Sequence, residues 1–293
     1  MQISLNNQTI ALDHSKGDIS FVSHAHSDHL NGVKAKEKII CSNETKLLAK
    51  LEGEIVSPDN IQLFEAGHML GSKQIVLDTN EKRITYSGDI RLKDSILFRK
   101  AQIPQTDELI IEATYGDPFY KFPENEEVYL LIESWVKKNS DKILLIGGYE
   151  MGKAQELIKI LNEYCSITPL VNENIARISD IYNQFGKKLD YIKIGTDEAE
   201  ELMRDSFVAV VSPKHSKRYF AKKISDAFSK KTLCAFASGW TLKYKYNTDI
   251  GFPLSDHASF FDIKNYIEES SAKKVKFFCG ESSHLEKEFK TLL

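Results

Sequence analysis

The sequence ISFVSHAHSDHLNG, residues 19–32, gathers four side chains of the kind that ligate metals into one turn after an apolar stretch of strand character. Alternate residues of an extended turn project to the same side, so His24 and His26 are expected to face one point. Asp28 and His29 begin the next element and can face a neighbouring point a few ångströms away. One short loop can therefore serve two adjacent ions, and imidazole and carboxylate are groups that zinc accepts.

Two further strand ends carry groups of the same kind. His68 lies in FEAGHMLGS and Asp89 in ITYSGDI, each after an apolar segment. His68 would complete a set of three histidines, and the two oxygens of Asp89 could bridge two ions. A single histidine or aspartate at a strand end is most often an ordinary surface or core residue. Six such groups at three strand ends favour a metal site instead.

The pattern of apolar residues divides the chain into an outer and an inserted part. Its first third consists of short β-segments with one clear helix, which indicates a sheet-rich half-domain. From about Glu124, helices and strands alternate, as is typical of a parallel sheet flanked by helices. We therefore predict an α/β protein with a discontinuous outer domain, residues 1–123 and 232–293, and an inserted domain, residues 124–231.

The composition is that of a globular protein able to bury a large core, with 293 residues of which 42% are hydrophobic. The N-terminal residues lack a basic segment followed by an apolar one, and no apolar run approaches the roughly 20 residues that span a bilayer. We expect a cytoplasmic protein without a membrane partner. The four cysteines include no CxxC pair, which argues for reduced thiols: Cys41, Cys165, Cys234 and Cys279.

Charge gives a weaker indication of the partner. The net charge of −3 does not predict a nucleic-acid-binding protein as a strongly basic domain would. One stretch of ten residues is nevertheless crowded with cations: Lys214, Lys217, Arg218, Lys222 and Lys223. Such a run is usually a solvated helix face, and contact with a polyanion is the alternative.

The ordered series of motifs resembles the β-CASP branch of the metallo-β-lactamase superfamily, which processes nucleic acids. HxHxDH alone is specific only to the superfamily. AGHMLGS, YSGD and EATYG, which contains Glu112, resemble the next motifs of the branch. GYEMGKAQEL and ASGW resemble the entry to and exit from its inserted cap, and FPLSDHASF resembles its second histidine motif, centred on His257. The likeness spans nearly the whole chain. It is greatest to small archaeal and bacterial β-CASP exonucleases, including the DNA-ligase-associated type, and extends to mRNA 3′-end-processing nucleases.

The resemblance implies a metallo-β-lactamase αββα sandwich with an inserted α/β cap domain. It also implies a zinc-dependent nuclease that hydrolyses phosphodiester bonds of DNA, RNA or both with a metal-activated water. We expect an exonuclease of DNA repair or nucleic-acid processing, with single strands or free ends as its partner. Two alternatives stay open: an RNA 3′-end-processing endo- or exoribonuclease, and a non-catalytic scaffold subunit. A small-molecule hydrolase of the superfamily would leave the inserted domain without a role.

The metal ligands follow from the same motifs. His24, His26, His68 and Asp89 are expected to form the tighter zinc site, and Asp28 and His29 a second site that Asp89 bridges. The chain would hold one or two zinc ions, with manganese or magnesium as alternatives at the second site. Asp28 could also orient the attacking water, because a carboxylate beside an activated water is suited to accept its proton.

The leaving oxygen of the phosphodiester needs a proton, and His257 is the predicted donor. Glu112 would bind its other ring nitrogen and raise the pKa of the imidazole. Without the family resemblance, His257 would be interpreted as a helix-start residue and Glu112 as an ordinary strand-end acid. We expect Asp256 to be the N-cap of the following helix rather than a catalytic group.

Two glycine-containing turns are candidate phosphate contacts. Gly152 and Lys153 lie where a strand joins a helix, and backbone amides at a helix start can bind phosphate. Ser238 and Gly239 lie in ASGW, where the inserted domain ends. Glycine-rich turns between strand and helix are common, and GK is not followed here by serine or threonine, so the first turn is no P-loop.

Cys279 stands in KVKFFCGE where RNA-processing members of the branch place a histidine before the glycine. The departure favours DNA, or DNA together with RNA, as the substrate. A deprotonated thiol can replace imidazole as a zinc ligand. A cysteine on a strand is also a small apolar residue whose side chain is shorter than imidazole. We favour the second interpretation, in which the second metal site is held by Asp28, His29 and Asp89.

Overall fold

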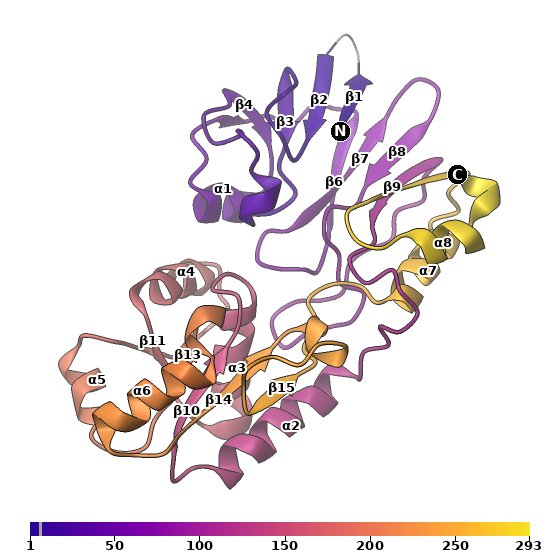
Figure 1. Ribbon diagram of the computed structural model, residues 1–293. Helices are drawn as coiled ribbons and strands as arrows, with labels where there is room; N and C mark the ends of the chain where they lie inside the picture. Colours follow the sequence, from indigo (N-terminus) through magenta and orange to yellow (C-terminus); the bar gives the residue numbers. More distant parts are fainter. Residues whose placement is uncertain (6–7) are drawn as a thin grey trace. The chain divides into compact units, whose positions relative to one another are not determined.

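The computed structural model describes residues 1–5 and 8–293, which form two compact units. The first, called unit 1, contains Met1–Asp94, Phe98–Lys121 and Asp256–Leu293. The second, called unit 2, contains Ser95–Leu97 and Phe122–Ser255. Each unit has its own sheets and its own apolar core, and the elements of both are labelled in Figure 1.

Unit 1 contains two five-stranded sheets. The first has the order β1-β2-β3-β4-β5, in which only β1 and β2 are antiparallel. Its strands are β1 (Gln2–Leu5), β2 (Gln8–Leu12), β3 (Ile19–Phe21), β4 (Lys38–Ile40) and β5 (Glu54–Ile55). The second sheet has the order β16-β9-β8-β7-β6. Its strands are β6 (Ile61–Glu65), β7 (Lys73–Asp78), β8 (Arg83–Tyr86), β9 (Glu108–Glu112) and β16 (Lys274–Phe278).

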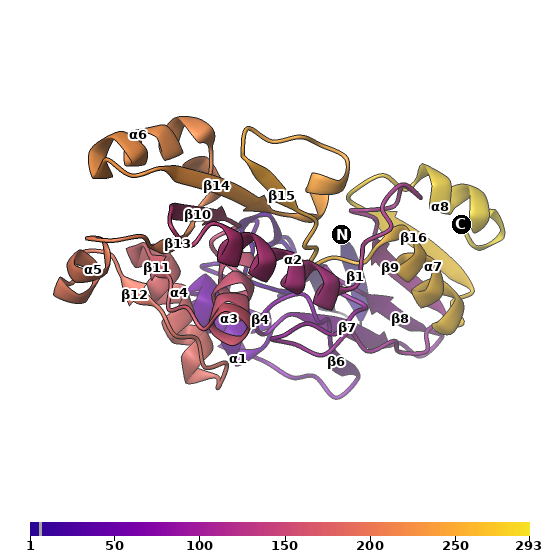
Figure 2. The same ribbon diagram turned by 90° about the horizontal axis from the view of Figure 1, so that it is seen from below.

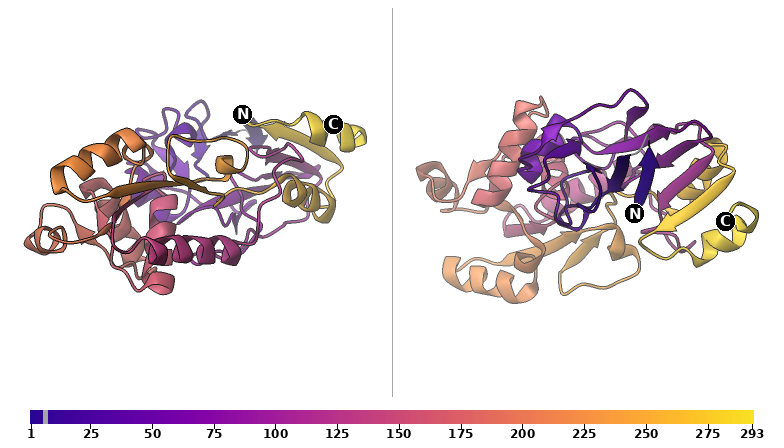
Figure 3. Two further views of the ribbon diagram at one scale, coloured as in Figure 1. Left: turned by 60° about the horizontal axis from the view of Figure 1, so that its bottom comes forward. Right: turned by 90° about the horizontal axis from the view of Figure 1, so that it is seen from above.

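The two sheets share one apolar core. Ile10 and Phe21 of the first sheet belong to the same buried cluster as Ile75, Leu77 and Ile110 of the second. Such β-branched and aromatic residues suit strands that are covered on a face by a second sheet. The outer face of the second sheet packs against α7 (Phe260–Glu269) and α8 (Ser283–Glu288), which Figure 3 shows in yellow beside the strands. The unit also contains η1 (Ser27–His29), α1 (Asn43–Ala49) and η4 (Lys290–Leu292).

Strand direction explains why the sequence motifs of unit 1 converge. β6 and β8 are both antiparallel to β7, and β8, β9 and β16 are parallel to one another. The carboxyl ends of β6, β8, β9 and β16 therefore lie at the same edge of the sheet. His68, Asp89 and Cys279 follow β6, β8 and β16, and Glu112 ends β9, so these side chains, far apart in the sequence, meet at that edge.

Unit 2 is built on one parallel sheet of six strands in the order β12-β11-β13-β10-β14-β15. The strands are β10 (Ile143–Gly147), β11 (Leu170–Val171), β12 (Ile192–Lys193), β13 (Val208–Val211), β14 (Thr232–Ala237) and β15 (Ile250–Phe252). The helices are α2 (Asn125–Lys138), α3 (Lys153–Cys165), α4 (Glu173–Gln184), α5 (Asp197–Leu202) and α6 (Arg218–Phe228), with short turns η2 (Pro213–His215) and η3 (Gly239–Leu242).

In the part of the chain that the structure describes, no helix has both the length and the apolarity to cross a bilayer.

Helices cover both faces of this sheet. Ala221 of α6 and Ala199 of α5 belong to one buried cluster with Leu145 and Cys234 of the central strands. The α2 and α3 helices pack together on the other side of the sheet, as the turned view in Figure 2 shows. Because both faces are covered, the central strands are continuous apolar runs rather than alternating ones.

The predicted α/β class is confirmed. The chain leaves unit 2 at Ser255 rather than at Lys231. The physical reason is that β14 pairs with β10 and β15 pairs with β14, so both strands complete the sheet of unit 2.

The expectation that Asp256 caps the following helix is wrong. Ser259 is the N-cap of α7: its hydroxyl accepts a hydrogen bond from the backbone amide of Asp262. The Asp262 carboxylate accepts in return from the backbone amide of Ser259, which completes a capping box.

Candidate metal centre

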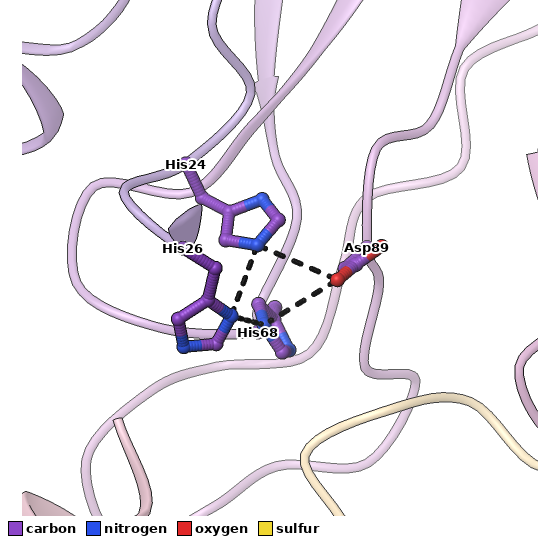
Figure 4. A group of neighbouring side chains, drawn as sticks. All are labelled: His24, His26, His68 and Asp89. Carbon is purple, nitrogen blue, oxygen red and sulfur yellow. Dashed lines mark hydrogen bonds and ion pairs between the residues drawn. The ribbon is translucent and has the colours of Figure 1, made fainter. Parts of the chain in front are cut away.

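Four buried or half-buried side chains of unit 1 converge on one point, as Figure 4 shows. His24 lies three residues after β3, and His26 lies at the start of η1. His68 follows β6 by three residues and Asp89 follows β8 by three. The structure thus brings together the four residues that were predicted to form the tighter site.

The distances among these donors suit a tetrahedral zinc ion. Nε2 of His24 and Nε2 of His68 lie 3.1 and 3.2 Å from Nδ1 of His26. Oδ2 of Asp89 lies 3.4 Å from His24 Nε2 and 3.8 Å from His68 Nε2. Ligands about 2.0 Å from a tetrahedral zinc stand about 3.3 Å from one another. Three nitrogens and one oxygen form a donor set that zinc accepts, so the residues present fit the ion.

The buried histidines are prepared to act as neutral ligands. His68 Nδ1 donates a hydrogen bond to the backbone carbonyl of Asp256 at 2.8 Å, which leaves the lone pair on Nε2, the atom that faces the centre. His24 Nδ1 lies 3.0 Å from the hydroxyl of Ser23. Burial and the neighbouring histidines hold the pKa of His24 and of His68 well below its usual range. Both rings are therefore neutral near pH 7, as metal binding requires.

A second group lies on the other side of the Asp89 carboxylate. His29 Nε2 is 3.5 Å from Asp89 Oδ1 and 3.8 Å from Asp28 Oδ2. Asp89 therefore presents one oxygen to each group, the arrangement predicted for a bridging ligand. The side chain of Asp28 is 79% exposed, so this second position is open to solvent on one side. His29, Asp28 and Asp89 could hold a second ion.

A buried carboxylate that the sequence analysis missed orients His29. Asp13 accepts hydrogen bonds from His29 Nδ1 at 2.7 Å, from both the amide and the hydroxyl of Ser23 at 2.7 Å, and from the Tyr86 hydroxyl at 2.8 Å. The signal was its place directly after β2, which runs parallel to β3. Because parallel strands end at the same edge, Asp13 had to lie beside the turn that carries the histidines.

The Asp13 hydrogen bond also changes the electrostatics of His29. Burial alone would lower the pKa of this imidazole. The bond to Asp13 and the carboxylates of Asp89, Asp13 and Asp28 outweigh burial and raise the pKa to about 9. Without metal, His29 is therefore protonated at neutral pH, whereas His24 and His68 are neutral.

Asp89 is held in a narrow space. Gly88 has a φ of +53°, and a Cβ atom at this position would lie 2.6 Å from the Cβ of Ser23, so only glycine fits before the carboxylate. Burial and the charge of Glu112 raise the pKa of Asp89 to about 7, although His257 and His29 oppose the shift. A buried carboxylate of this kind is stabilised by a bound cation.

Glu112 and His257 lie within hydrogen-bond distance beside the four donors. Nδ1 of His257 is 2.9 Å from Glu112 Oε2, and its Nε2 faces the centre, 4.0 Å from Asp89 Oδ2. Glu112 is fully buried and also accepts from the backbone amide of Ile90 and from the Thr114 hydroxyl. Burial would lower the pKa of His257, but Glu112 and Asp89 raise it to about 10.

Cys279 also borders the centre. Its sulfur, a carboxylate oxygen of Asp89 and one of Glu112 lie within 4.8 Å of one another. Burial and these two carboxylates raise the pKa of the thiol to about 12, so without metal it is protonated. The thiol lies 3.8 Å from the Thr114 hydroxyl. Cys279 thus lies near Asp89 and Glu112, and its role as a metal ligand stays a prediction.

The predicted phosphate contacts lie in unit 2 at the ends of neighbouring strands. Gly152 precedes α3, and its amide donates to the side chain of Gln155 at 2.8 Å. Lys153 is buried, with its ammonium 3.1 Å from Glu156 Oε2. A phosphate contact from Lys153 would require this ion pair to open. Ser238 and Gly239 follow β14 and are buried too, and Ser238 Oγ accepts from the Trp240 amide.

Two sheets packed face to face, flanked by helices and carrying a histidine- and aspartate-rich edge, give the chain a metallo-β-lactamase-like α/β fold. A crystal structure of a protein of unknown function from Enterococcus faecalis is similar to it. The TM-score is 0.58 at 14% identity, covering 93% of this chain and 77% of the other. That likeness concerns the fold alone.

Sequence comparison places the chain within this fold more narrowly. A probable DNA ligase of Opitutus terrae is 28% identical over 87% of this chain and 26% of its own length. A probable RNase, MJ4, of Methanocaldococcus jannaschii is 36% identical over 39% of this chain and 28% of its own. The DNA cross-link repair protein pso2/snm1 of Schizosaccharomyces pombe is 25% identical over 76% and 44%. No family model matches the chain.

These relatives confirm, at modest identity, the resemblance to the β-CASP nucleases of the metallo-β-lactamase superfamily. In each case the match covers less than half of the relative's own length: 26% of the DNA ligase, 28% of the RNase and 44% of the repair protein.

Metal binding at pH 8 should release protons unequally from the two positions. Filling the position of His24, His26 and His68 should release few protons, since His24 and His68 are already neutral. Filling the second position should release about one proton, because His29, whose pKa is about 9, must lose its proton to bind. Calorimetric titration in buffers of different ionisation enthalpy counts these protons. His29→Ala should abolish the release. An unchanged proton count in this variant would contradict the assignment.

Cys279→Ala should leave metal content unchanged and cleavage within about twofold of the wild type, because the cysteine side chain is shorter than imidazole and its thiol is protonated without metal. Elemental analysis and a nuclease assay on the same preparation test this. Cys165→Ala, at the end of α3, is the matched control. Loss of one metal equivalent together with activity in Cys279→Ala alone would make Cys279 a ligand.

Proposed function

We propose that the chain is a zinc-dependent nuclease that hydrolyses phosphodiester bonds of nucleic acid at the edge of unit 1. The observation that carries the proposal is the pair Glu112 and His257 beside the donors His24, His26 and Asp89. A metal centre alone would suit many hydrolases of this fold. A protonated histidine aimed at that centre by a buried carboxylate suits a reaction whose leaving group needs a proton.

The donors divide into two sets around Asp89. His24, His26, His68 and Asp89 Oδ2 would hold one ion, and Asp28, His29 and Asp89 Oδ1 a second, which could be zinc, manganese or magnesium. When bound, these ions supply the positive charge that acidifies a water molecule and neutralises the phosphate oxygens. Asp28 is exposed beside the second position, so it can orient the attacking water and accept its proton.

His257 protonates the leaving oxygen in this mechanism. Glu112 fixes the ring through Nδ1, so Nε2 is the atom directed to the centre. Without metal, Glu112 and Asp89 raise the pKa of the imidazole to about 10 against the effect of burial, and Glu112 contacts the ring directly. The donated proton converts the leaving oxygen into a hydroxyl group on the departing nucleotide. The Tyr115 ring lies edge-on to His257 at a centroid distance of 6.0 Å.

The relatives support nucleic acid as the substrate without choosing one polymer. Their names include a DNA ligase, an RNase and a DNA cross-link repair protein. Metal and backbone contacts act on the phosphodiester that DNA and RNA share. We propose that the chain acts on single-stranded DNA from a free end and also on RNA, in DNA repair or nucleic-acid processing.

We further propose that unit 2 is the β-CASP cap of this nuclease. Its six-stranded parallel sheet with helices on both faces is an architecture whose carboxyl strand ends bind ligands. Gly152, Ser238 and Gly239 all lie at such ends, after β10 and β14. They remain the candidates for phosphate contact in this unit, with the Lys153 ammonium engaged by Glu156.

Variants of His68 and His257 should separate metal binding from proton donation. His68→Ala should lose one equivalent of metal together with cleavage, since His68 belongs to the donor set. His257→Ala should keep its metal and lose about 100-fold or more in rate, the usual contribution of a general acid. Elemental analysis and initial rates measure both effects. His284→Ala, exposed on α8, is the control and should match the wild type. Equal metal loss in both variants would contradict the role given to His257.

End-labelled oligonucleotides test the activity itself. Single- and double-stranded DNA and RNA, with and without a 5′-phosphate, are incubated with the metal-loaded protein in zinc, manganese or magnesium. We expect progressive shortening of single-stranded DNA and of RNA from one end, and weaker action at higher salt because phosphate contacts release counterions. Cleavage of RNA alone would favour the 3′-end-processing alternative. A protein that binds metal and cleaves none of these substrates would contradict the proposal and favour a scaffold.

A further inference from the structure

Two exposed tyrosines of unit 2, Tyr149 and Tyr246, contact one buried phenylalanine, and a third exposed tyrosine, Tyr244, stands two residues before Tyr246. Tyr244 and Tyr246 alternate with lysines in the sequence Lys243–Tyr244–Lys245–Tyr246, which lies between η3 and β15. Tyr149 follows β10 by two residues. Their exposed fractions are 51% for Tyr244, 41% for Tyr246 and 51% for Tyr149. We name Tyr149, Tyr244 and Tyr246 the tyrosine cluster. Large aromatic surfaces of this extent on a folded unit indicate a binding site.

Two of the three rings contact the same buried side chain, and the Tyr244 ring lies 6.1 Å from that of Trp240. The centroid of the Tyr246 ring lies 4.7 Å from that of Phe236, and the centroid of the Tyr149 ring lies 6.4 Å from that of Phe236. Phe236 belongs to β14 and is only 4% exposed, so it forms the floor of the cluster. Burial and the nearby hydroxyls of Tyr149 and Tyr244 raise the pKa of Tyr246, which fits three phenol groups that share one place.

The segment that carries these tyrosines is held in position by backbone contacts. The Arg218 amide at the start of α6 donates to the carbonyl of Asn247 at 2.9 Å, and its guanidinium binds the Asp249 carboxylate. Asp249 also exchanges hydrogen bonds with Cys234 of β14: its amide donates to the Cys234 carbonyl, and its carboxylate accepts from the Cys234 amide. The rings are therefore presented by a fixed segment, which lowers the entropy lost when a ligand binds.

The position and charge of the cluster suit a polyanion with planar groups. Tyr149 and Phe236 lie at the carboxyl ends of β10 and β14, where parallel sheets bind ligands; Figures 1 and 2 show these neighbouring strands. Lys243 and Lys245 are exposed beside the tyrosines. Two carboxylates that stand close to the tyrosines in the sequence have partners. Asp249 is bound to Arg218, and Glu150 accepts from the amides of Asn172 and Asn174. The local surface is thus basic and aromatic.

We propose that the tyrosine cluster is a stacking platform for the bases of single-stranded nucleic acid, with Lys245 on the backbone phosphates. The proposal rests on the proposed function and adds a binding site outside the metal centre. Aromatic rings interleaved with lysines bind single strands without regard to sequence, because every base offers a flat face. Stacking on unpaired bases also selects single-stranded over double-stranded substrate, since paired bases are already stacked.

Binding of nuclease-resistant phosphorothioate oligonucleotides to the metal-loaded protein tests the platform without cleavage. The double variant Tyr244→Ala/Tyr246→Ala should bind single-stranded DNA and RNA at least about fivefold more weakly than the wild type, as measured by fluorescence anisotropy. Tyr244→Phe/Tyr246→Phe keeps both rings and should bind like the wild type. An oligonucleotide with abasic central positions lacks the bases that would stack. The wild type should bind it as weakly as the alanine variant binds the intact oligonucleotide. The alanine substitutions should not weaken binding of the abasic oligonucleotide any further.

The control variant is Tyr219→Ala, on α6. Tyr219 is 70% exposed and packs under the Lys223 ammonium at 4.7 Å, so it matches the cluster residues in type and charge surroundings. It should keep wild-type affinity, and an equal loss would overturn the assignment to the tyrosine cluster. Equal weakening of intact and abasic oligonucleotides would overturn stacking. If the wild type cleaves unmodified substrate and Tyr244→Ala/Tyr246→Ala binds the intact oligonucleotides as the wild type does, the stacking proposal is wrong and the proposed function stands. A wild type that neither binds nor cleaves overturns both.

Discussion

Burying the carboxylate of Asp89 among histidines constrains the whole edge of unit 1. Its two oxygens face different rings: Oδ2 lies 3.4 Å from His24 Nε2 and Oδ1 lies 3.5 Å from His29 Nε2. A buried ion without compensating charge is strongly destabilising. The strand directions of both sheets, the glycine before Asp89 and the Asp13 network all serve to keep donors at this point. The fold therefore gathers possible cation ligands at this edge of the sheets, whereas an apolar core would exclude such polar side chains.

The site was predictable from sequence as far as local spacing reaches. His24 and His26 lie in one turn, so their convergence follows from strand and turn geometry. His68 and Asp89 each stand three residues after a strand, and a shared sheet edge brings them to that turn. Asp13 was missed because a single aspartate after a strand has no distinguishing pattern. Its role depends on β2 pairing beside β3, which is a property of the fold and not of local sequence.

The fold was predictable where apolar periodicity was long and uncertain where elements are short. β10 and β13 are continuous apolar runs, so the parallel sheet of unit 2 was foreseen from their alternation with helices. β15 has only three residues, one of them glycine, and no sequence pattern marked it. Its pairing with β14 extends unit 2 to Ser255. The cap of α7 was misjudged for a similar reason, since Asp256 and Ser259 are both good N-cap residues.

The four histidines with shifted pKa values show how one cluster can supply both ligands and a proton. Burial with histidine neighbours keeps His24 and His68 neutral, whereas carboxylate partners raise the pKa of His29 and His257. What separates the two kinds is the partner of Nδ1. His24 meets a hydroxyl and His68 a carbonyl, while His29 meets Asp13 and His257 meets Glu112. Metal would displace the proton from His29, whose Nε2 points at the bridging carboxylate between the ions. His257 is not one of the donors His24, His26, His68 and Asp89, although it forms a second possible ligand group with His68 and Asp256. In the proposed mechanism its contact with Glu112 makes it the imidazole that keeps a proton for the substrate.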